Sequence, residues 1–270
     1  MENLSTTSLI SIEGLDSSFK ETNVKLLKNK LEEDGYSVVS FDFPQYKRDS
    51  SYFVRSFLNN PSYRDNPETF EDCCKYCIYY ALDRYDTYIN EIKDYMGKVD
   101  VILFDRYITS NLHNAARMMP DINKALNVLE WFYRFEYETL KLPKEDISIF
   151  LNMPYEKSKI IRHAKVNKDL NEADELFCKH SYEIFDMIYN LQNEENKKYS
   201  KEIQYITRIG PIYKININLD VDNIDFVKTL TDEEERNKSK EIIFDKICDE
   251  SYIFIQTAIK MRKSLYGKKD

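Results

Sequence analysis

The chain has little glycine, a single tryptophan and few cysteines. Its 270 residues include five glycines, one tryptophan and five cysteines. An odd number of cysteines does not suit a disulfide framework, and three of them crowd into the sequence CCKYC at 73–77. Cys73 and Cys77 share a helical face, but no second Cys or His pair follows at zinc spacing. We therefore expect these cysteines to fill an apolar helix interface rather than to bind a metal.

Long apolar runs and an excess of basic charge are also lacking. No run approaches the roughly 18 apolar residues that a membrane-spanning helix needs. The first residues, MENLSTT, lack the basic and apolar segments of a signal peptide. The net charge is −8, which disfavours broad binding to nucleic acid, although a few local arginines can still bind a small anion. We expect a cytoplasmic protein with no nucleic-acid and no membrane partner.

Short apolar runs rich in β-branched residues recur along the chain and predict strands. They cover residues 8–13, 36–43, 99–105, 146–152 and 212–219. Their near-continuous apolar character is typical of strands that are covered on both faces. Helical patterns separate them, at residues 25–35, 68–96, 121–141 and 171–197. This alternation predicts a parallel sheet with crossover helices, whose ligands bind at the carboxyl ends of the strands.

Residues after about 221 form a charged, helical tail. The sequence TDEEERNKSK at 231–240 is typical of a solvated helix start or a short linker. Residues 241–263 carry an apolar stripe, which must pack on another part of the protein. We therefore divide the chain into a main domain, 1–230, and a C-terminal helical extension, 231–270.

The sequence GLDSSFKET at 14–22 follows the first strand and has the outline of a phosphate-binding loop. Gly14, Ser18, Lys20 and Thr22 fit a loop that directs backbone N–H groups and a lysine at an anion. Phe19, however, stands where the loop has its second glycine. Glu21 replaces the hydroxyl that holds magnesium, and its carboxylate can ligate the metal or repel the nucleotide. A plain strand-to-helix turn with a solvated lysine is the alternative.

Two further segments carry candidate binding residues. Tyr80 and Arg84 lie four apart on one helical face, where they can stack on and hydrogen-bond a nucleobase, or form an ordinary exposed ion pair. Asp105 and Arg106 end a buried strand, where they can hold Mg²⁺ and a phosphate, or simply meet solvent. The histidines have no ligand spacing and receive no catalytic role.

Read together, these segments resemble the thymidylate kinase family of P-loop nucleoside monophosphate kinases over roughly residues 8–219. The resemblance rests on ISIEGLDSSFKET, FPQY, YALDRYD, DRYITSN and LPKEDISIFLNMP, and on KDLNEADELFCKHSYEIF, which is similar to the lid of the bacterial enzymes. It implies a three-layer α/β/α P-loop kinase with a five-stranded parallel sheet, a lid region at about 155–180 and an extra C-terminal helix.

The resemblance also implies roles for individual residues. The catalytic set is Asp16, Lys20, Asp105 and Arg106, with Asp105, or Glu21, near magnesium. The ATP-binding residues are Gly14, Ser18, Lys20 and Thr22. The residues expected to bind the acceptor nucleotide are Phe43, Pro44, Tyr80, Arg84, Arg106, Ser110 and Asn111. Arg162 is the expected lid arginine.

These roles imply transfer of the ATP γ-phosphate, with Mg²⁺, to dTMP or a close pyrimidine analogue, giving dTDP. The chain departs from the family at Ser17 and Phe19, which replace loop glycines, and at Glu21. It also has Tyr46 where some members carry an arginine, a role that Lys47 or Arg48 can take over. The alternative hypothesis is therefore a catalytically impaired relative that binds a nucleotide or a protein partner. The family also suggests a homodimer, through helices 68–96 and 121–141.

Overall fold

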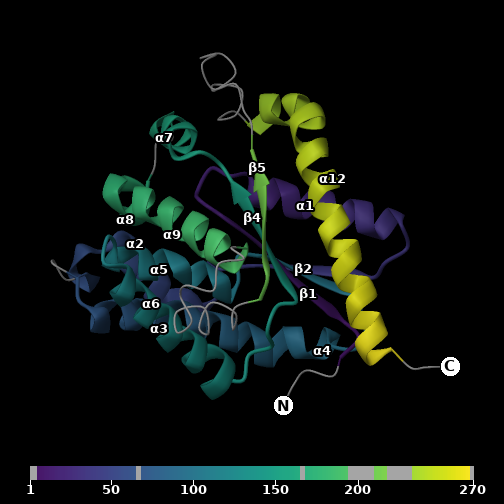
Figure 1. Cartoon of the computed structure of the whole chain (residues 1–270), viewed down its shortest axis with the longest axis horizontal. Coiled ribbons are helices and arrows are strands. Elements are labelled where there is room, and N and C mark those ends of the chain that lie inside the picture. Colours follow the sequence, from purple (N-terminus) through teal and green to yellow (C-terminus); the bar gives the residue numbers. More distant parts are fainter. Residues whose placement is uncertain (1–4, 65–67, 165–167, 194–209, 218–232, 268–270) are drawn as a thin grey trace.

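A parallel sheet forms the centre of the computed structural model, which describes residues 5–64, 68–164, 168–193, 210–217 and 233–267 (Figure 1). Its strand order is β2-β3-β1-β4-β5. The strands are β1 Ser8–Gly14, β2 Val38–Asp42, β3 Val101–Asp105, β4 Ile147–Asn152 and β5 Ile212–Asn216. All the predicted strands are thus confirmed; residues 218–219 of the last predicted run lie outside the described residues.

The strand register brings the expected site to one edge of the sheet. Ile12 on β1 pairs with Asp105 on β3, and Asp105 also pairs with Asp42 on β2. Gly14 pairs with Leu151 near the end of β4. The carboxyl ends of these strands therefore lie side by side, and the polar segments that follow them share one edge, as parallel topology requires.

The predicted helices are present, and some differ in extent. The helices of the first half are α1 Lys20–Glu33, α2 Tyr52–Asn59, α3 Phe70–Thr87 and α4 Lys93–Tyr95. Those of the middle are α5 Leu112–Ala115, α6 Ile122–Tyr133, α7 Tyr155–Ala164, α8 Leu170–Ala173 and α9 Glu175–Asn193. π-Helical segments extend α3 over Tyr88–Ile92 and α6 over Arg134–Thr139. The helices α2, α5 and α7 were not predicted.

The single helix expected over 171–197 is instead two helices, α8 and α9. The residue between them, Asp174, has an extended backbone. Its side chain accepts a hydrogen bond of 2.9 Å from the backbone N–H of Phe177, and Asp169 caps α8 in the same way. Asp is a favoured N-cap residue, so α9 begins anew at this point. Residues 194–197 of the predicted helix lie outside the described residues.

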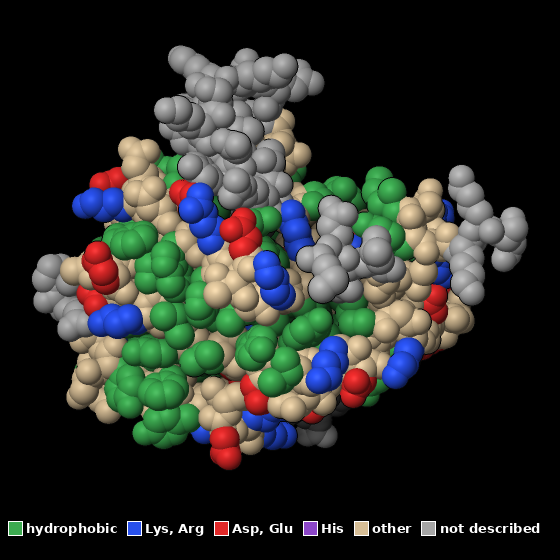
Figure 2. Space-filling model, turned by 90° about the horizontal axis from the view of Figure 1, so that it is seen from below, with side chains coloured by type: hydrophobic (Ala, Val, Ile, Leu, Met, Phe, Trp, Pro, Cys, Tyr) green, Lys and Arg blue, Asp and Glu red, His purple; other side chains and the backbone are tan. Residues whose placement is uncertain are grey.

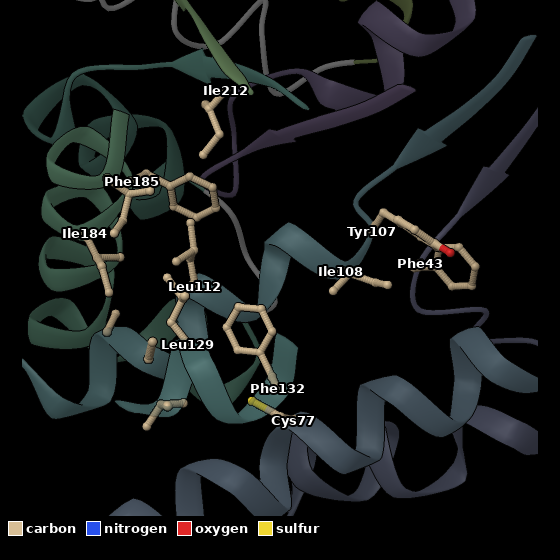
Figure 3. Packing of buried hydrophobic residues seen from close by; sticks show 14 of the residues in the cluster. Phe43, Cys77, Tyr107, Ile108, Leu112, Leu129, Phe132, Ile184, Phe185 and Ile212 are labelled. Atoms are coloured by element: carbon tan, nitrogen blue, oxygen red, sulfur yellow. The ribbon is translucent and has the colours of Figure 1, made fainter. Parts of the chain in front are cut away.

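The helices cover both faces of the sheet and give the predicted three layers (Figure 1). Leu9 of β1 packs with α3, α5, α6 and α9, whereas its neighbour Ile10 packs with α1 and the C-terminal helix. Figure 3 shows the first of these cores, in which Cys77 meets Phe132. The predicted apolar role of the CCKYC segment is confirmed, because Cys73 and Cys77 are fully buried.

The expected C-terminal helix is α12, Glu233–Tyr266, and it runs beside α1 over one face of the sheet (Figure 1). Its apolar stripe packs into the second core, as predicted, through Phe244, Ile247, Ile255 and Ile259 among others. Lys30 of α1 pairs with Asp249 of α12, so the two helices are also tied by charge. The expected domain boundary at 230–231 lies outside the described residues.

The surface mixes apolar and charged side chains. Figure 2 shows one face on which hydrophobic side chains gather, with Lys and Arg interspersed among Asp and Glu. The exposed apolar residues of α2 and α3 include Tyr52, Phe53 and Leu82. Across the described part of the chain, no helix has the length and the apolar character to cross a membrane. The homodimer stays a prediction.

Candidate active site

The phosphate-loop turn begins at a position that requires glycine. Gly14 ends β1 with a φ of 153°, in a region that side chains rarely adopt. A Cβ atom there would lie 2.9 Å from the carbonyl oxygen of Leu151 and 2.5 Å from Ser18 Oγ. The clash with Leu151 involves the backbone of the neighbouring strand, which cannot shift without disturbing the sheet. Gly14 therefore lets the chain leave the sheet edge and enter the loop.

The loop keeps a left-handed backbone at two positions that are not glycine. Ser17 has a φ of 74° and Phe19 a φ of 60°, and these are the residues that replace glycines of the family pattern. A left-handed conformation costs a residue with a Cβ atom about 1–2 kcal/mol. The substitutions have therefore not converted the loop into an ordinary turn; the left-handed conformation is retained with strain.

Lys20 begins α1 and is folded back into the loop. Its Nζ donates a hydrogen bond of 2.7 Å to the carbonyl oxygen of Leu15 and lies 3.5 Å from Ser18 Oγ. Burial lowers the pKa of Lys20 to about 8, and the positive charge of Arg106 adds to this effect. The alternative of a solvated lysine is therefore wrong. A bound phosphate anion would restore the charge of this ammonium.

The residues present in the loop fit the phosphates of ATP. Ser17 Oγ is buried and has no hydrogen-bond partner among the described residues. Phe19 precedes α1 but gives it no side-chain cap, and a helix N-terminus leaves backbone N–H groups for an anion. Thr22 lies half-buried in the first turn of α1. An orphaned hydroxyl, an uncapped helix and a buried lysine together suit a phosphate ligand.

The candidate magnesium residues differ in position. Asp105 ends β3, and burial raises the pKa of its carboxyl, while Lys20 and Arg106 oppose the rise. Glu21 points to solvent, where it pairs with Lys25 at 2.7 Å. No cluster of at least three His, Cys, Asp or Glu side chains suited to a metal occurs in the described ranges. Mg²⁺ in kinases is held by one or two carboxylates plus nucleotide phosphates, so Asp105 fits it better than Glu21 does.

Arg106 joins the third strand end to the phosphate loop. Its guanidinium donates to the carbonyl oxygen of Gly14 at 3.1 Å and to a carboxylate oxygen of Asp16 at 2.5 Å. Arg106 has a φ of 64°, so its backbone is held in a conformation that is uncommon for arginine. The guanidinium is thus fixed between the loop and the neighbouring cavity, where it can reach an anion in either.

One cavity lies beside this arginine and is walled by every residue that the resemblance assigns to the acceptor nucleotide. Its wall includes Asp16, Phe43, Pro44, Tyr80, Arg84, Arg106, Ser110 and Asn111. These side chains come from the loop, from the ends of β2 and β3, and from α3. Other wall residues were not predicted: Tyr46, Leu58, His113, Asn114, Asp169, Asn171 and Phe177.

Arg84 is held by a carboxylate that the sequence did not reveal. Its Nε and one terminal nitrogen donate to the two oxygens of Glu136, both at 2.7 Å. Both residues are buried, so the alternative of an exposed ion pair at Arg84 is wrong. Asn111 donates to the same carboxylate. Glu136 therefore orients two residues of the cavity wall, Arg84 and Asn111, both of which are distant from it in the sequence.

Glu13 connects the phosphate loop to the segment after β3. Its carboxylate accepts a hydrogen bond of 2.9 Å from the backbone N–H of Tyr107 and another from the Ser110 hydroxyl. Complete burial raises the pKa of Glu13 to about 7. A signal for it was present in the sequence, since a glutamate directly before Gly14 ends an otherwise buried strand.

His113 was assigned no role from the sequence, yet it lies on the cavity wall. Its Nε2 is 3.1 Å from a guanidinium nitrogen of Arg106. Burial and the charge of Arg106 lower the pKa of His113 to about 3. The imidazole is therefore neutral and accepts at Nε2, which helps to orient Arg106. No sequence spacing could have indicated this contact.

The lid region meets the site through all of its helices. Ser158 of α7 donates to the carbonyl oxygen of Asp16 at 3.1 Å. Asn171 of α8 accepts from Arg64 at 2.7 Å and from Arg117 at 2.5 Å, next to the cavity. The lid therefore touches both the phosphate loop and the acceptor wall.

Arg162, the expected lid arginine, is buried between α7 and α9 and does not line the cavity. It contacts Glu175 at 3.3 Å. Its Nε and Nη1 have no hydrogen-bond partner among the described residues. Arg48, the neighbour of Tyr46, pairs with Glu91 rather than reaching the cavity wall.

Comparison with known proteins agrees with this geometry. A parallel sheet whose first strand leads through a glycine turn into a lysine-bearing helix is the arrangement of P-loop nucleotide-binding proteins. The thymidylate kinase family model matches residues 12–207. Because this match covers well over half of the sequence, the chain belongs to the thymidylate kinase family.

Individual relatives are distant. A probable thymidylate kinase from Pyrococcus abyssi is 27% identical over 168 residues, which are 62% of this chain and 74% of the relative. Its counterpart from Pyrococcus horikoshii is 25% identical over 167 residues, with the same coverage. The structure of thymidylate kinase from Candida albicans matches with a TM-score of 0.54 at 19% identity, over 87% of this chain and 94% of that one. At that identity, the likeness concerns the fold.

Proposed function

We propose that this protein transfers the γ-phosphate of ATP to dTMP, or to a close pyrimidine analogue, and gives dTDP and ADP. Membership of a family of nucleoside monophosphate kinases supports the reaction class. The observation that carries the proposal is the shared cavity: all the residues expected to bind the acceptor nucleotide wall it, and Arg106 links it to the phosphate loop. Donor and acceptor phosphates can therefore meet at Arg106.

In this proposal the acceptor nucleotide lies in the cavity with its phosphate at Arg106 and Asp16. Tyr80, whose ring is half-buried, stacks on the pyrimidine, while Phe43 and Pro44 border the nucleoside. Arg84, Ser110 and Asn111 give polar contacts to the base. Their side chains are held by Glu136 and Glu13, so they keep their orientation before the nucleotide binds.

On the donor side, Lys20 binds the β- and γ-phosphates, and the N-terminus of α1 adds backbone N–H groups. Ser17, Ser18 and Thr22 offer hydroxyls along the same loop. Asp105 would hold Mg²⁺, and the ion would supply positive charge that offsets the negative charge developing on the transferred phosphoryl group. In-line phosphoryl transfer needs positioning and charge neutralisation more than covalent chemistry, and the loop and Arg106 supply both.

A second candidate function follows from the loop itself. Ser17 and Phe19 have the left-handed backbone that glycines of the family pattern adopt without strain. Glu21 stands where that pattern has a hydroxyl that binds the metal. A protein with this loop that binds a nucleotide or a protein partner without catalysis is the second candidate. It differs from the first in one measurable respect, because it predicts no ADP formation that depends on Lys20.

The experiment that tests the proposal measures ADP and dTDP from purified protein with ATP, Mg²⁺ and dTMP. Lys20→Ala should lower turnover by about 10²–10³, the usual effect of removing one electrostatic contact to a transition state. Lys25→Ala is the matched control, because Lys25 lies in solvent on the same helix and pairs with Glu21. Equal turnover by wild type and Lys20→Ala would contradict the proposal; absent turnover in both would favour the second candidate.

A further inference from the structure

The left-handed backbone at Phe19 needs a partner that holds it. Phe19 directly precedes Lys20, so its backbone sets where α1 begins and where the Lys20 side chain starts. Glycine takes this conformation freely, whereas phenylalanine does not. Within the loop, Phe19 makes no side-chain cap that could compensate. A contact that can offset this strain is made by the ring, outside the loop.

That contact comes from the C-terminal helix. The ring of Phe19 packs edge-on against Phe244 of α12, with centroids 5.0 Å apart and an interplanar angle of 67°. This T-shaped arrangement is one that aromatic pairs prefer. Phe19 is half-buried and joins the edge of the second core, in which Phe244 is 1% exposed. The ring of the loop residue thus rests on a fixed anchor.

The anchor is itself held firmly. Downstream of Phe244, Lys30 of α1 pairs with Asp249, and the Tyr252 hydroxyl donates to Asp34 at the end of α1. Arg262 near the end of α12 donates to Asp146 at 2.7 Å, which fixes the helix to the start of β4. Because α12 is tied to α1 and to the sheet, the position of Phe244 is set by contacts outside the loop.

We propose that Phe244 is a positioning residue for the phosphate-donor loop, so that α12 forms part of the donor site. In the family pattern, a second loop glycine adopts the left-handed turn before Lys20 without strain. In this chain, packing of Phe19 on Phe244 offsets the strain of that turn. The proposal rests on the proposed use of ATP at this loop, but the contact itself can be measured without turnover.

The first test is amide hydrogen exchange of the loop, residues 14–22, in the full-length protein. Phe244→Ala should exchange faster there by about three- to tenfold, which corresponds to the usual coupling of an aromatic pair. Phe244→Leu keeps most of the packed volume but lacks the ring, so it should also increase the exchange rate of the loop. This variant provides the test if Phe244→Ala folds poorly. Ile255→Ala is the matched control, because Ile255 is equally buried but lies about 16 Å further along α12.

A second arm separates positioning of the loop from general stability. In Phe244→Ala and Phe244→Leu, KM for ATP should rise about three- to tenfold, while kcat and KM for dTMP stay near wild type. Phe19→Gly should suppress both effects of Phe244→Ala, because glycine needs no anchor in this conformation. A structural role alone would give no such suppression.

The outcomes separate the two proposals. Faster loop exchange in the Phe244 variants, suppressed by Phe19→Gly and absent in Ile255→Ala, supports the positioning role even if the wild type proves catalytically inactive. Equal loop exchange in Phe244→Ala and Ile255→Ala, or unchanged loop exchange in both Phe244 variants, would overturn it. Failure of the proposed function is read separately, from wild-type turnover and its dependence on Lys20.

Discussion

Arg84, which lines the cavity, forms a buried ion pair with Glu136 through two hydrogen bonds. Two hydrogen bonds of 2.7 Å join them, and the side chains are 2% and 0% exposed. Arg84 comes from α3, and Glu136 comes from the π-helical end of α6. The pair therefore joins two helices on one face of the sheet and, at the same time, sets the direction of a guanidinium on the cavity wall.

Removal of the carboxylate should be costly. Glu136→Ala leaves the Arg84 guanidinium buried without its partner and should lower the free energy of unfolding by about 3–5 kcal/mol. Urea denaturation measures the change. The matched control, Glu21→Ala, removes an exposed pair with Lys25 and should cost at most about 1 kcal/mol. Similar losses in the two variants would show that the buried pair is not what holds α3 to α6.

Glu13 should give stability an unusual pH dependence. Burial raises its pKa from 4.5 to about 7, so between these values the folded protein holds a proton that the unfolded chain has released. The free energy of unfolding therefore falls as the pH rises through this window, and the contribution of Glu13 is about 3 kcal/mol. In Glu13→Gln this loss disappears. Denaturation at pH 5, 6, 7 and 8 tests it, with the exposed Glu33→Gln as a control that should follow the wild-type profile.

ATP affinity should depend on the charge of Lys20. The pKa of about 8 is below the usual 10.5, so the free protein loses this positive charge as the pH rises above 8. The dissociation constant for ATP should then increase, by at most about tenfold per pH unit. In Lys20→Met, binding should be weak and its pH dependence above 8 lost. Calorimetry at pH 7, 8 and 9 measures both, and an affinity in the wild type that does not change with pH would contradict the role of Lys20.

Nucleotides should stabilise the protein unequally. The acceptor residues predicted from the sequence share one cavity, whereas the donor loop has strained residues at two glycine positions. At about 100 times its dissociation constant, dTMP should add about 2.7 kcal/mol to the free energy of unfolding, with a smaller response to ATP at the same concentration. Thermal denaturation compares them, with AMP as a control that has the phosphate but a purine base. A larger shift with ATP would show that the donor side is the better preserved.

The sequence predicted those parts of the structure that depend on local pattern. The continuous apolar runs gave the strands, and parallel topology then placed Gly14 and Asp105 at one edge without further information. The motifs that follow the strands predicted part of the cavity wall, including Phe43 and Pro44. The break before α9 has a signal in the sequence, since Asp174 is a good N-cap, but the helical pattern of residues 171–197 predicts one continuous helix across it.

The parts that were missed depend on contacts between distant segments. Nothing near Glu136 indicates that its partner lies 52 residues earlier in the sequence, because a glutamate on an amphipathic helix is ordinary. His113 matters only because folding places it against Arg106. Phe19 was recognised as a departure from the loop pattern, yet its anchor, Phe244, lies in the helix whose role the sequence did not explain.

The most direct measurement is calorimetric titration of dTMP into the wild type and two arginine variants. We expect one dTMP per chain in the wild type and about 10- to 100-fold weaker binding in Arg106→Met, which loses charged hydrogen bonds to the phosphate. Arg134→Met should bind like the wild type, because Arg134 pairs with Glu130 in solvent away from the cavity. Absence of dTMP binding in the wild type, or equal affinity in Arg106→Met, would contradict the assignment of this cavity to a pyrimidine monophosphate.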